Sequence, residues 1–500
     1  MDGKKIHKEK EDLYHLIHSL TNSELIQFRL YTKKLVQNED SIYLKLFDKI
    51  KKQSTYDEAK LMKQLKLTKE GLRDSKFYLF NMILESLKKA DKKNKKTNFL
   101  NEMMELNILK RKGLVKKAAK KFRKLKKIAL INYDYGLLYN MVKHTDILIL
   151  FNESEDRVNE MKLKKEEELM HYLELAENLS AYRHLSVTVL GLHYEIDDKR
   201  LERKEELSHY LNHPLLADEH MAKSDIAKYL YYEAKTLIYM GINDYNNASI
   251  YALKGLEFIR TIASPHRNDY NKLITNLSNY IHSRLSLDDI DAYHLMMPKM
   301  DALVHKNYDE LSFSMKSKTF ETKASLVLEY LLINRDYEVF EEKFDNLYTQ
   351  YKRYEEVIHP NFKVTILFNW SKLFFIGGKL DDALKWCKEL HDTQRHNPTH
   401  AVLVAGNILR IMIHYDMGKL NMIPHLVRTA EYYIKSRNRY FKVERCFIKG
   451  INKIKPFHSK RDKAHLFKKL YDELTALLKD EDEQIINRMR DIEVWIKSKF

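Results

Sequence analysis

Glycine, proline and cysteine are scarce in this chain. Its 500 residues contain 12 Gly, 7 Pro and 2 Cys, although average usage is about 7% for Gly and about 5% for Pro. Phosphate-cradling glycine loops, chains of β-hairpins and low-complexity tracts need these residues, so the composition disfavours all three. Cys387 and Cys446 are too far apart in sequence to form a Cys-x-x-Cys pair, which excludes a structural zinc site of the usual spacing.

Long hydrophobic runs are also missing. The longest apolar runs are of the size of Ile147 to Phe151, whereas a membrane-spanning helix needs about 20 such residues. The N-terminal segment has no apolar stretch of signal-peptide length. Two scattered cysteines in a long chain are typical of a reducing compartment. We therefore expect a soluble, cytoplasmic protein with no membrane partner.

Catalytic and cofactor motifs are absent as well. The chain has no Gly-x-Ser-x-Gly, no Gly-x-x-x-x-Gly-Lys, no Gly-x-Gly-x-x-Gly and no His-Glu-x-x-His, which are the patterns of nucleophile elbows, nucleotide loops and zinc proteases. Arg445 beside Cys446 would lower the pKa of that thiol, but a sequence neighbour is weak evidence. We expect no enzymatic activity, no cofactor and no metal, and we assign no catalytic residue.

Helical periodicity dominates what is present. Nearly every stretch longer than 12 residues places apolar side chains at helical spacing. Two capping boxes, Thr21 with Glu24 and Thr55 with Glu58, mark helix starts, because such a pair satisfies two backbone N–H groups that have no partner within the helix. The sequence predicts an all-α chain that begins with a small helical N-terminal module over residues 1–90.

From about residue 98 the pattern changes to paired helices with tight turns, and residues 367–390 show it best. A first helix, a Gly-Gly turn and a return helix follow one another, defined by Leu367, Trp370, Phe374, Gly377, Gly378, Leu380, Ala383, Cys387 and Leu390. This pattern resembles a tetratricopeptide repeat (TPR). A small residue such as Ala383 lets two helix backbones approach closely while large residues fill the space around it.

Four further segments fit the same frame: residues 102–125, 232–255, 324–347 and 407–430. Two of them carry Phe340 or Ile423 where the family prefers alanine, which predicts wider helix spacing. Positions 340, 383 and 423 are 43 and 40 residues apart, whereas a regular TPR repeats every ~34. The resemblance implies a right-handed superhelix of antiparallel helix pairs, a TPR-like α-solenoid over residues 91–500, with a concave face that binds peptides or proteins. The chain also resembles bacterial helical-repeat proteins, with a similar front block at Leu20–Phe28, and that likeness suggests no activity.

The positive charge is concentrated in one segment. Residues 88–127 hold 17 Lys/Arg and 3 Asp/Glu, a local excess that accounts for most of the net charge of +17. Within the first repeat, at about 98–130, Leu114, Ala118, Phe122, Leu125 and Ala129 would share one helical face. The opposite face would hold the cations Lys116, Lys120, Arg123, Lys124 and Lys127. Such a strip attracts phosphate backbones or acidic proteins, although a solvated face of a lysine-rich chain is the simpler explanation.

Residues 56–87 have the outline of a helix-turn-helix, with a turn at 66–68. Lys69, Arg73 and Lys76 would be exposed on the second helix, but Glu70 and Asp74 at the same helix start would repel phosphates. The alternative interpretation is a helical cap on the first edge of the repeat array.

Two functional hypotheses follow. The first is a non-enzymatic scaffold or adaptor that binds a protein or peptide partner through a helical-repeat groove. The second is a nucleic-acid-associated protein that holds phosphates with segment 88–127. The oligomeric state is left open.

Overall fold

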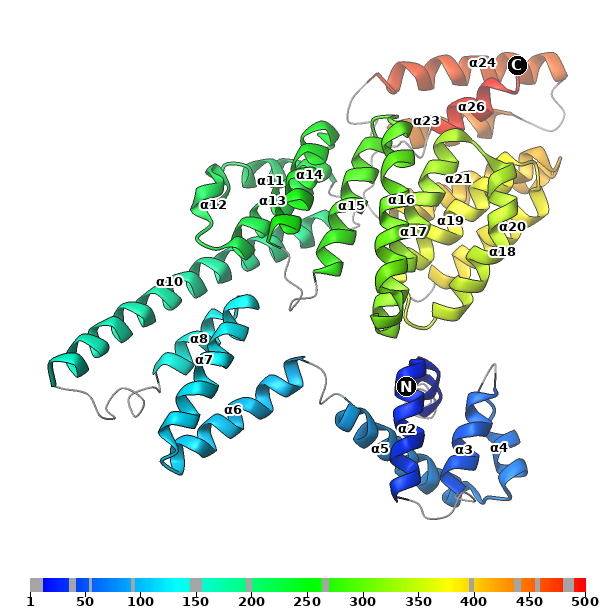
Figure 1. The fold of residues 1–500 in the computed structure, drawn as a ribbon. Helices are drawn as coiled ribbons and strands as arrows, with labels where there is room; N and C mark the ends of the chain where they lie inside the picture. Colours follow the sequence, from blue (N-terminus) through cyan, green and yellow to red (C-terminus); the bar gives the residue numbers. More distant parts are fainter. Residues whose placement is uncertain are drawn as a thin grey trace. The chain divides into compact units, whose positions relative to one another are not determined.

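The computed structural model describes residues 12–35, 42–53, 56–90, 95–143, 155–194, 200–262, 269–394, 400–435, 442–454, 459–479 and 490–500. Within these ranges the regular structure consists of α-helices and short 3-10 helices, with no strand (Figure 1). The predicted all-α fold class is confirmed.

Contacts divide the chain into two compact units. The first comprises residues 1–176 and 307–316, and the second comprises residues 177–306 and 317–500. The division falls inside the long helix α10 (Glu155–Tyr194). The boundary that the sequence predicts at residue 90 stays a prediction.

The front of the first unit contains a helical segment at 12–19, then α2 (Asn22–Leu35), α3 (Ile42–Lys51), α4 (Glu58–Leu65) and α5 (Lys69–Ala90). One hydrophobic cluster joins them, with Phe28, Phe47 and Leu79 among its buried members. The capping box at Thr21 and Glu24 is confirmed: the Thr21 N–H donates to the Glu24 carboxylate at 2.7 Å, and the Glu24 N–H donates to the Thr21 hydroxyl at 3.3 Å. Thr55 lies outside the described residues, and Asp57 caps α4 instead, accepting from the Lys60 N–H at 2.9 Å.

The rest of the first unit contains α6 (Lys95–Arg111), α7 (Val115–Ile131), α8 (Tyr135–Lys143) and the first part of α10. Helix α7 packs against α6 and against α8. Tight turns at Gly113 and Tyr133 make these three helices run back and forth.

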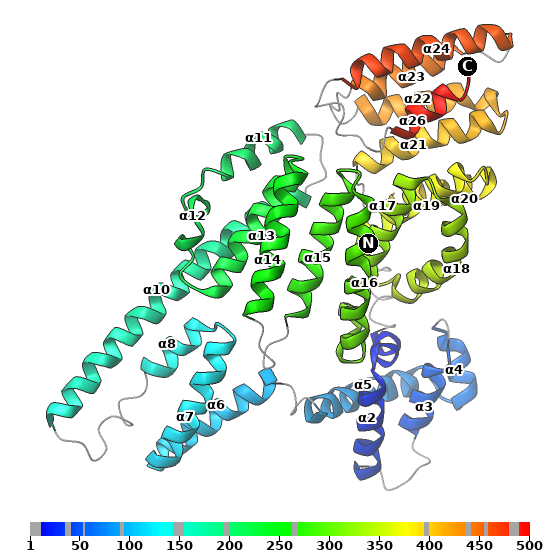
Figure 2. The ribbon, with the colours of Figure 1, turned by 45° about the horizontal axis from the view of Figure 1, so that its top comes forward.

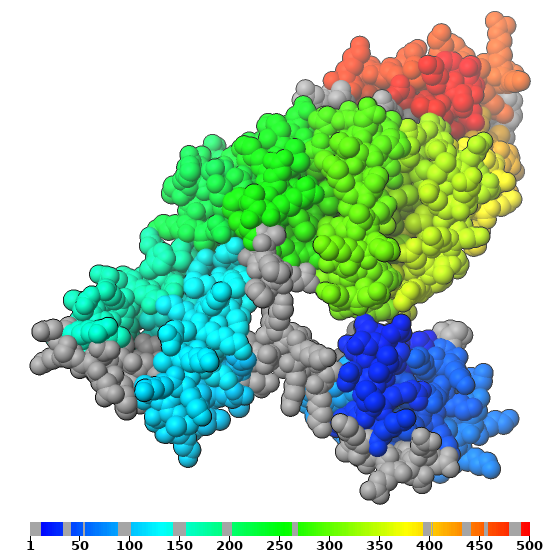
Figure 3. All heavy atoms as spheres, in the orientation of Figure 1, coloured from blue at the N-terminus to red at the C-terminus, as the bar shows by residue number. Residues whose placement is uncertain are grey.

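The second unit contains the larger helical array. Its elements after α10 are α11 (Arg200–Tyr210), α12 (Pro214–Ala217), η2 (Glu219–Met221), α13 (Asp225–Gly241), α14 (Tyr245–Thr261), α15 (Tyr270–Leu285), α16 (Ile290–Asn307), α17 (Phe313–Asn334), α18 (Tyr337–Tyr354), α19 (Pro360–Ile376), α20 (Leu380–Gln394), α21 (His400–Asp416), η4 (Leu420–Met422), α22 (Ile423–Lys435), α23 (Lys442–Lys453), α24 (Lys460–Leu477) and α26 (Arg490–Lys497). The short η3 (Tyr308–Glu310) belongs to the first unit. In the space-filling view the helices from α13 to α20 present one continuous surface (Figure 3).

Five successive hairpins in this unit share one turn. Each has a residue with positive φ at its centre, namely Asn243, Asp288, Arg335, Gly378 and Gly418. In each, that residue's N–H donates to the carbonyl three residues before it, and the next N–H donates to the carbonyl five residues before that next residue. This pair of bonds is a Schellman motif, which satisfies the last carbonyls of the first helix. The turns are 45, 47, 43 and 40 residues apart, so the array has a real but irregular repeat that exceeds the ~34 residues of a TPR.

The cost of positive φ is met in two ways among these turns. Gly378 and Gly418 have no Cβ and adopt the conformation freely. The other three turns have a non-glycine residue followed by an aspartate that caps the second helix. Asp244, Asp289 and Asp336 accept from backbone N–H groups three residues ahead at 3.1, 3.2 and 3.1 Å. A capping aspartate contributes about 1 kcal/mol, which offsets the ~1–2 kcal/mol cost of a left-handed residue.

The first helices of the hairpins pack against one another in chain order (Figure 2). Helix α13 contacts α15, and α19 contacts α21. The Tyr270 hydroxyl bonds to Thr319 at 3.0 Å between α15 and α17, and Phe320 meets Phe362 edge to face between α17 and α19. We call α13, α15, α17, α19 and α21 the first-helix row. The predicted helix pairing is thus present, whereas the predicted right-handed superhelix stays a prediction.

First and second helices differ in exposure. No residue is exposed from Ile226 to Gly241 in α13 or from Asn361 to Ile376 in α19. The second helices are amphipathic: α20 buries Ala383, Cys387 and Leu390 and exposes one charged side. A helix without an exposed residue is enclosed by its neighbours, whereas a helix with one apolar stripe packs that stripe on the core and exposes the rest.

Candidate functional site

Helix α7 has the two faces that its sequence predicts. Ala118, Leu125 and Ala129 are buried, and Phe122 is half-buried. Leu114 does not share that face and remains 46% exposed. It precedes the helix with non-helical backbone angles, and its N–H closes the Gly113 turn onto the Leu109 carbonyl at 3.0 Å. Helical periodicity therefore does not apply to Leu114.

All five predicted cations of α7 are exposed: Lys116, Lys120, Arg123, Lys124 and Lys127. The helix contains eight Lys/Arg and no acidic residue. Four of the five cations lie along one line, whereas Lys124 lies beside that line and pairs with Glu102 of α6 at 2.8 Å. Lys88 at the start of the basic segment pairs with Glu85 at 2.7 Å, and residues 91–94 of that segment lie outside the described residues.

The helix-turn-helix outline at 56–87 is present as α4, a turn at 66–68 and α5. Lys69 and Arg73 are exposed as expected. The expectation that Lys76 is exposed is wrong, because its ammonium group lies 2.6 Å from the Tyr56 hydroxyl and 3.7 Å from the Glu58 carboxylate. Arg73 contacts the neighbouring Asp74 at 3.3 Å. Lys76 is thus engaged within the protein and Arg73 contacts a carboxylate, so this surface is a weak candidate for binding phosphate.

Polar side chains link the first-helix row where its members meet. The Asn276 amide of α15 donates to the Tyr229 hydroxyl of α13 at 3.1 Å. That hydroxyl donates in turn to Glu233 at 3.1 Å, and Ser186 of α10 donates to the other Glu233 oxygen at 3.1 Å. Burial raises the pKa of Glu233, and the hydrogen bonds from its two hydroxyl donors partly oppose that rise in pKa. A buried network of this kind fixes the register of the helices that it joins.

A second polar link lies between α15 and α17. His282 bonds to the Glu329 carboxylate at 2.7 Å. Burial by itself would lower the pKa of His282, but the carboxylate outweighs it and the pKa is raised. Glu329 shares one side of α17 with Thr322 and Ser325, since the three are spaced by three and four residues. All three are half-exposed, and we call them the α17 inner stripe.

Neither cysteine has the environment of a reactive thiol. Burial raises the pKa of Cys387 to about 12, and its thiol donates to the Gly406 carbonyl at 3.4 Å. Burial also raises the pKa of Cys446 to about 11, with a further rise from Glu473 at 3.7 Å. The lowered pKa that Arg445 suggested for Cys446 is therefore wrong, because the carboxylate and the burial act the other way.

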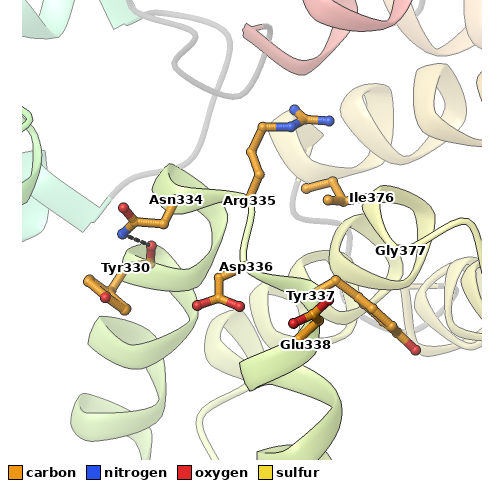
Figure 4. Close-up of a pocket in the computed structure, with 8 residues that line it drawn as sticks. All are labelled: Tyr330, Asn334, Arg335, Asp336, Tyr337, Glu338, Ile376 and Gly377. Atoms are coloured by element: carbon orange, nitrogen blue, oxygen red, sulfur yellow. Dashed lines mark hydrogen bonds between the residues drawn. The ribbon is translucent and has the colours of Figure 1, made fainter.

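A shallow hollow of about 560 Å³ lies where the α17–α18 turn meets the end of α19. Figure 4 shows Arg335 extending away from Asp336. The polar groups around it serve the hairpin itself: Asp336 caps α18, and the Tyr337 hydroxyl donates to Glu341 at 2.8 Å. These contacts assign Asp336 and Tyr337 a role in the hairpin itself.

Among the described residues no group of three or more His, Cys, Asp and Glu side chains is placed to hold a metal ion. No helix of the described ranges combines the length and the apolar character needed to cross a membrane.

Models of known protein families, curated proteins and solved structures were all compared with this chain, and none of them matches it.

Proposed function

We propose that this protein is a non-enzymatic scaffold or adaptor that binds a protein or peptide partner along the first-helix row of its second unit. The observation that carries the proposal is the contrast within the hairpins. Second helices expose an ordinary charged surface, whereas the free side of the first helices is polar but only partly accessible, as in the α17 inner stripe. A small number of partly covered polar groups can orient a bound ligand and give specificity.

The chemistry of that side fits an extended polypeptide. Thr322 and Ser325 are small and carry hydroxyl groups, and the His282–Glu329 pair beside them adds an ionisable imidazole and a carboxylate. Small polar residues leave room for a backbone and supply hydrogen bonds to it, and partly desolvated charges set specificity. Helical-repeat arrays use such surfaces to hold partners.

The test is partner capture from the protein's own cells at low salt after nuclease treatment, with two matched variants. Thr322→Arg with Ser325→Arg places two large cations on the α17 inner stripe. Ala302→Arg with Thr349→Arg places the same charge on exposed positions of α16 and α18. We expect a specific protein partner that the inner variant loses and the outer variant keeps. A partner that both variants retain equally would contradict the proposal.

A further inference from the structure

Four cations of α7 form a straight line on the protein surface. Lys116, Lys120, Arg123 and Lys127 are spaced by four, three and four residues, which places them within one narrow side of the helix. At 1.5 Å of rise per residue they span about 16 Å, with gaps of about 6, 4.5 and 6 Å. All four are exposed. We call this set the α7 stripe.

The stripe receives no counter-charge from the described neighbouring helices. Three of the other four cations of α7 are neutralised: Lys121 pairs with Glu105, Lys124 with Glu102 and Lys126 with Glu168, whereas Lys117 beside the stripe is exposed. The four stripe residues form no ion pair with any part of the chain that the structure describes. Carboxylates of α6 and α10 thus stabilise cations that flank the α7 stripe, whereas the like charges within the stripe repel one another. An external polyanion would relieve that repulsion.

Three features identify the kind of polyanion. The apolar side of α7 is covered by protein, so the helix has nothing to insert into a lipid bilayer. No aromatic side chain stands on the stripe, because Phe122 is turned inward, and binding of single strands relies on stacking. No large apolar anchor lies between Lys116 and Lys127 on that side, whereas protein interfaces have an apolar centre.

We propose that the α7 stripe binds the phosphate backbone of double-stranded nucleic acid without reading its sequence. A rigid, evenly charged rod matches a rigid, evenly charged duplex, whose phosphates recur every ~3.4 Å along each strand. Lys and Arg side chains that reach phosphates fix position and carry no sequence information. This function goes beyond the scaffold proposal and uses a surface in the other unit, so either can fail alone.

The experiment is a titration of the full chain with a fluorescein-labelled 20-base-pair DNA duplex between 50 and 200 mM salt. Four neutralised phosphates give a log–log slope of about −3.6, or an affinity loss of about 10²-fold over that range. The stripe variant replaces Lys116, Lys120, Arg123 and Lys127 by Gln. The control variant replaces Lys299, Lys306, Lys388 and Arg428 by Gln, which removes the same charge from exposed positions of the second unit. Thermal melts of both variants check that they fold.

We expect the stripe variant to lose at least ten-fold in affinity and most of its salt slope, while the control variant stays within about two-fold. An equal loss in both variants would overturn the proposal, since net charge alone would then explain binding. Unchanged binding in the stripe variant would overturn it as well. Displacement of the duplex by polyglutamate at equal charge concentration would instead identify an acidic protein as the partner of the stripe.

Discussion

Helix α7 and helix α19 are of equal length and have opposite surroundings. Each has 17 residues. Helix α7 buries three small or apolar residues on one side and exposes cations on the other, whereas α19 has no exposed residue from Asn361 to Ile376. The two helices show what an amphipathic pattern does and does not reveal. An amphipathic sequence indicates which side of the helix faces water, whereas a helix enclosed by its neighbours has no such stripe to indicate which neighbour each side meets.

The largest loss of stability is expected when a large buried side chain of α19 is truncated to alanine. Trp370 is fully buried and meets Phe344, Tyr351 and Trp386 at ring distances of 5.0 to 5.2 Å. Trp370→Ala should lower the free energy of unfolding of the second unit by about 3–5 kcal/mol. Lys120→Ala in α7 should change that of its own unit by less than ~0.5 kcal/mol. Chemical denaturation followed by circular dichroism measures both free energies of unfolding. Similar losses in the two variants would contradict the difference in burial between α7 and α19.

Two glycines differ in how closely a neighbouring helix approaches them. Gly255 lies where α14 packs against α15, whereas Gly191 of α10 has open space beside it. A Cβ on Gly255 would lie 2.6 Å from the Asn276 side-chain oxygen, while a Cβ on Gly191 of α10 would meet nothing within 4 Å. Gly255→Ala should therefore destabilise the fold by about 1–3 kcal/mol. Gly191→Ala should stabilise it by about 0.5–1 kcal/mol. Denaturant midpoints of the two variants should move in opposite directions.

The repeated turns allow a test with changes of opposite sign. Gly378 and Arg335 occupy the same place in successive hairpins, with φ of 72° and 53°. Gly378→Ala should destabilise the unit by about 1 kcal/mol, because alanine disfavours this conformation, and Arg335→Gly should stabilise it by up to ~1 kcal/mol. Melting curves of both variants check the pair. If Arg335→Gly were destabilising, the arginine side chain would matter more than its backbone conformation.

The smallest expected effect is a pH dependence of the stability that the His282–Glu329 pair gives to the first-helix row. Because Glu329 raises the pKa of His282 above its ordinary value, the folded state holds the proton more tightly than the unfolded state. The stabilisation is complete below about pH 6.5 and is lost as the pH rises through the higher folded pKa. Glu329→Gln should cost under ~1 kcal/mol at pH 5.5 and almost nothing at pH 9. A loss of equal size at both pH values would assign Glu329 a role unrelated to the histidine.

Local patterns in the sequence were sufficient for much of this molecule. The Thr21–Glu24 capping box, the helix pairs at 367–390 and 407–430 and the two faces of α7 are present as predicted. The position of the small residue lies five places after each turn residue, as Ala248 follows Asn243 and Ala383 follows Gly378. Both alanines are fully buried, which explains why the frame detected the pairs at 232–255 and 367–390, whereas the pair at 407–430 was detected with Ile423 at that position.

One hairpin of the second unit was missed, the one formed by α15 and α16. It carries Tyr293 five places after its turn residue, where the ring stacks on Tyr330 at 4.2 Å, and its turn has no glycine. The hairpin at 324–347 was predicted from its apolar spacing although its turn has no glycine, but the positive φ of Arg335 was not predicted. The pairing of Lys124 with Glu102 could not be predicted from the sequence, because it depends on how α6 packs against α7 and not on helical periodicity.

One capture experiment tests the central claim that two surfaces in different units bind different partners. The wild-type chain, the Thr322→Arg/Ser325→Arg variant and the four-Gln variant of the α7 stripe are purified from the native cells at low salt, each with and without nuclease. We expect the Thr322→Arg/Ser325→Arg variant to lose a nuclease-resistant protein partner and to keep nucleic acid. The α7 variant should keep the protein partner and lose nucleic acid. Loss of both ligands from either variant alone would contradict the claim, since it would place them on one shared surface.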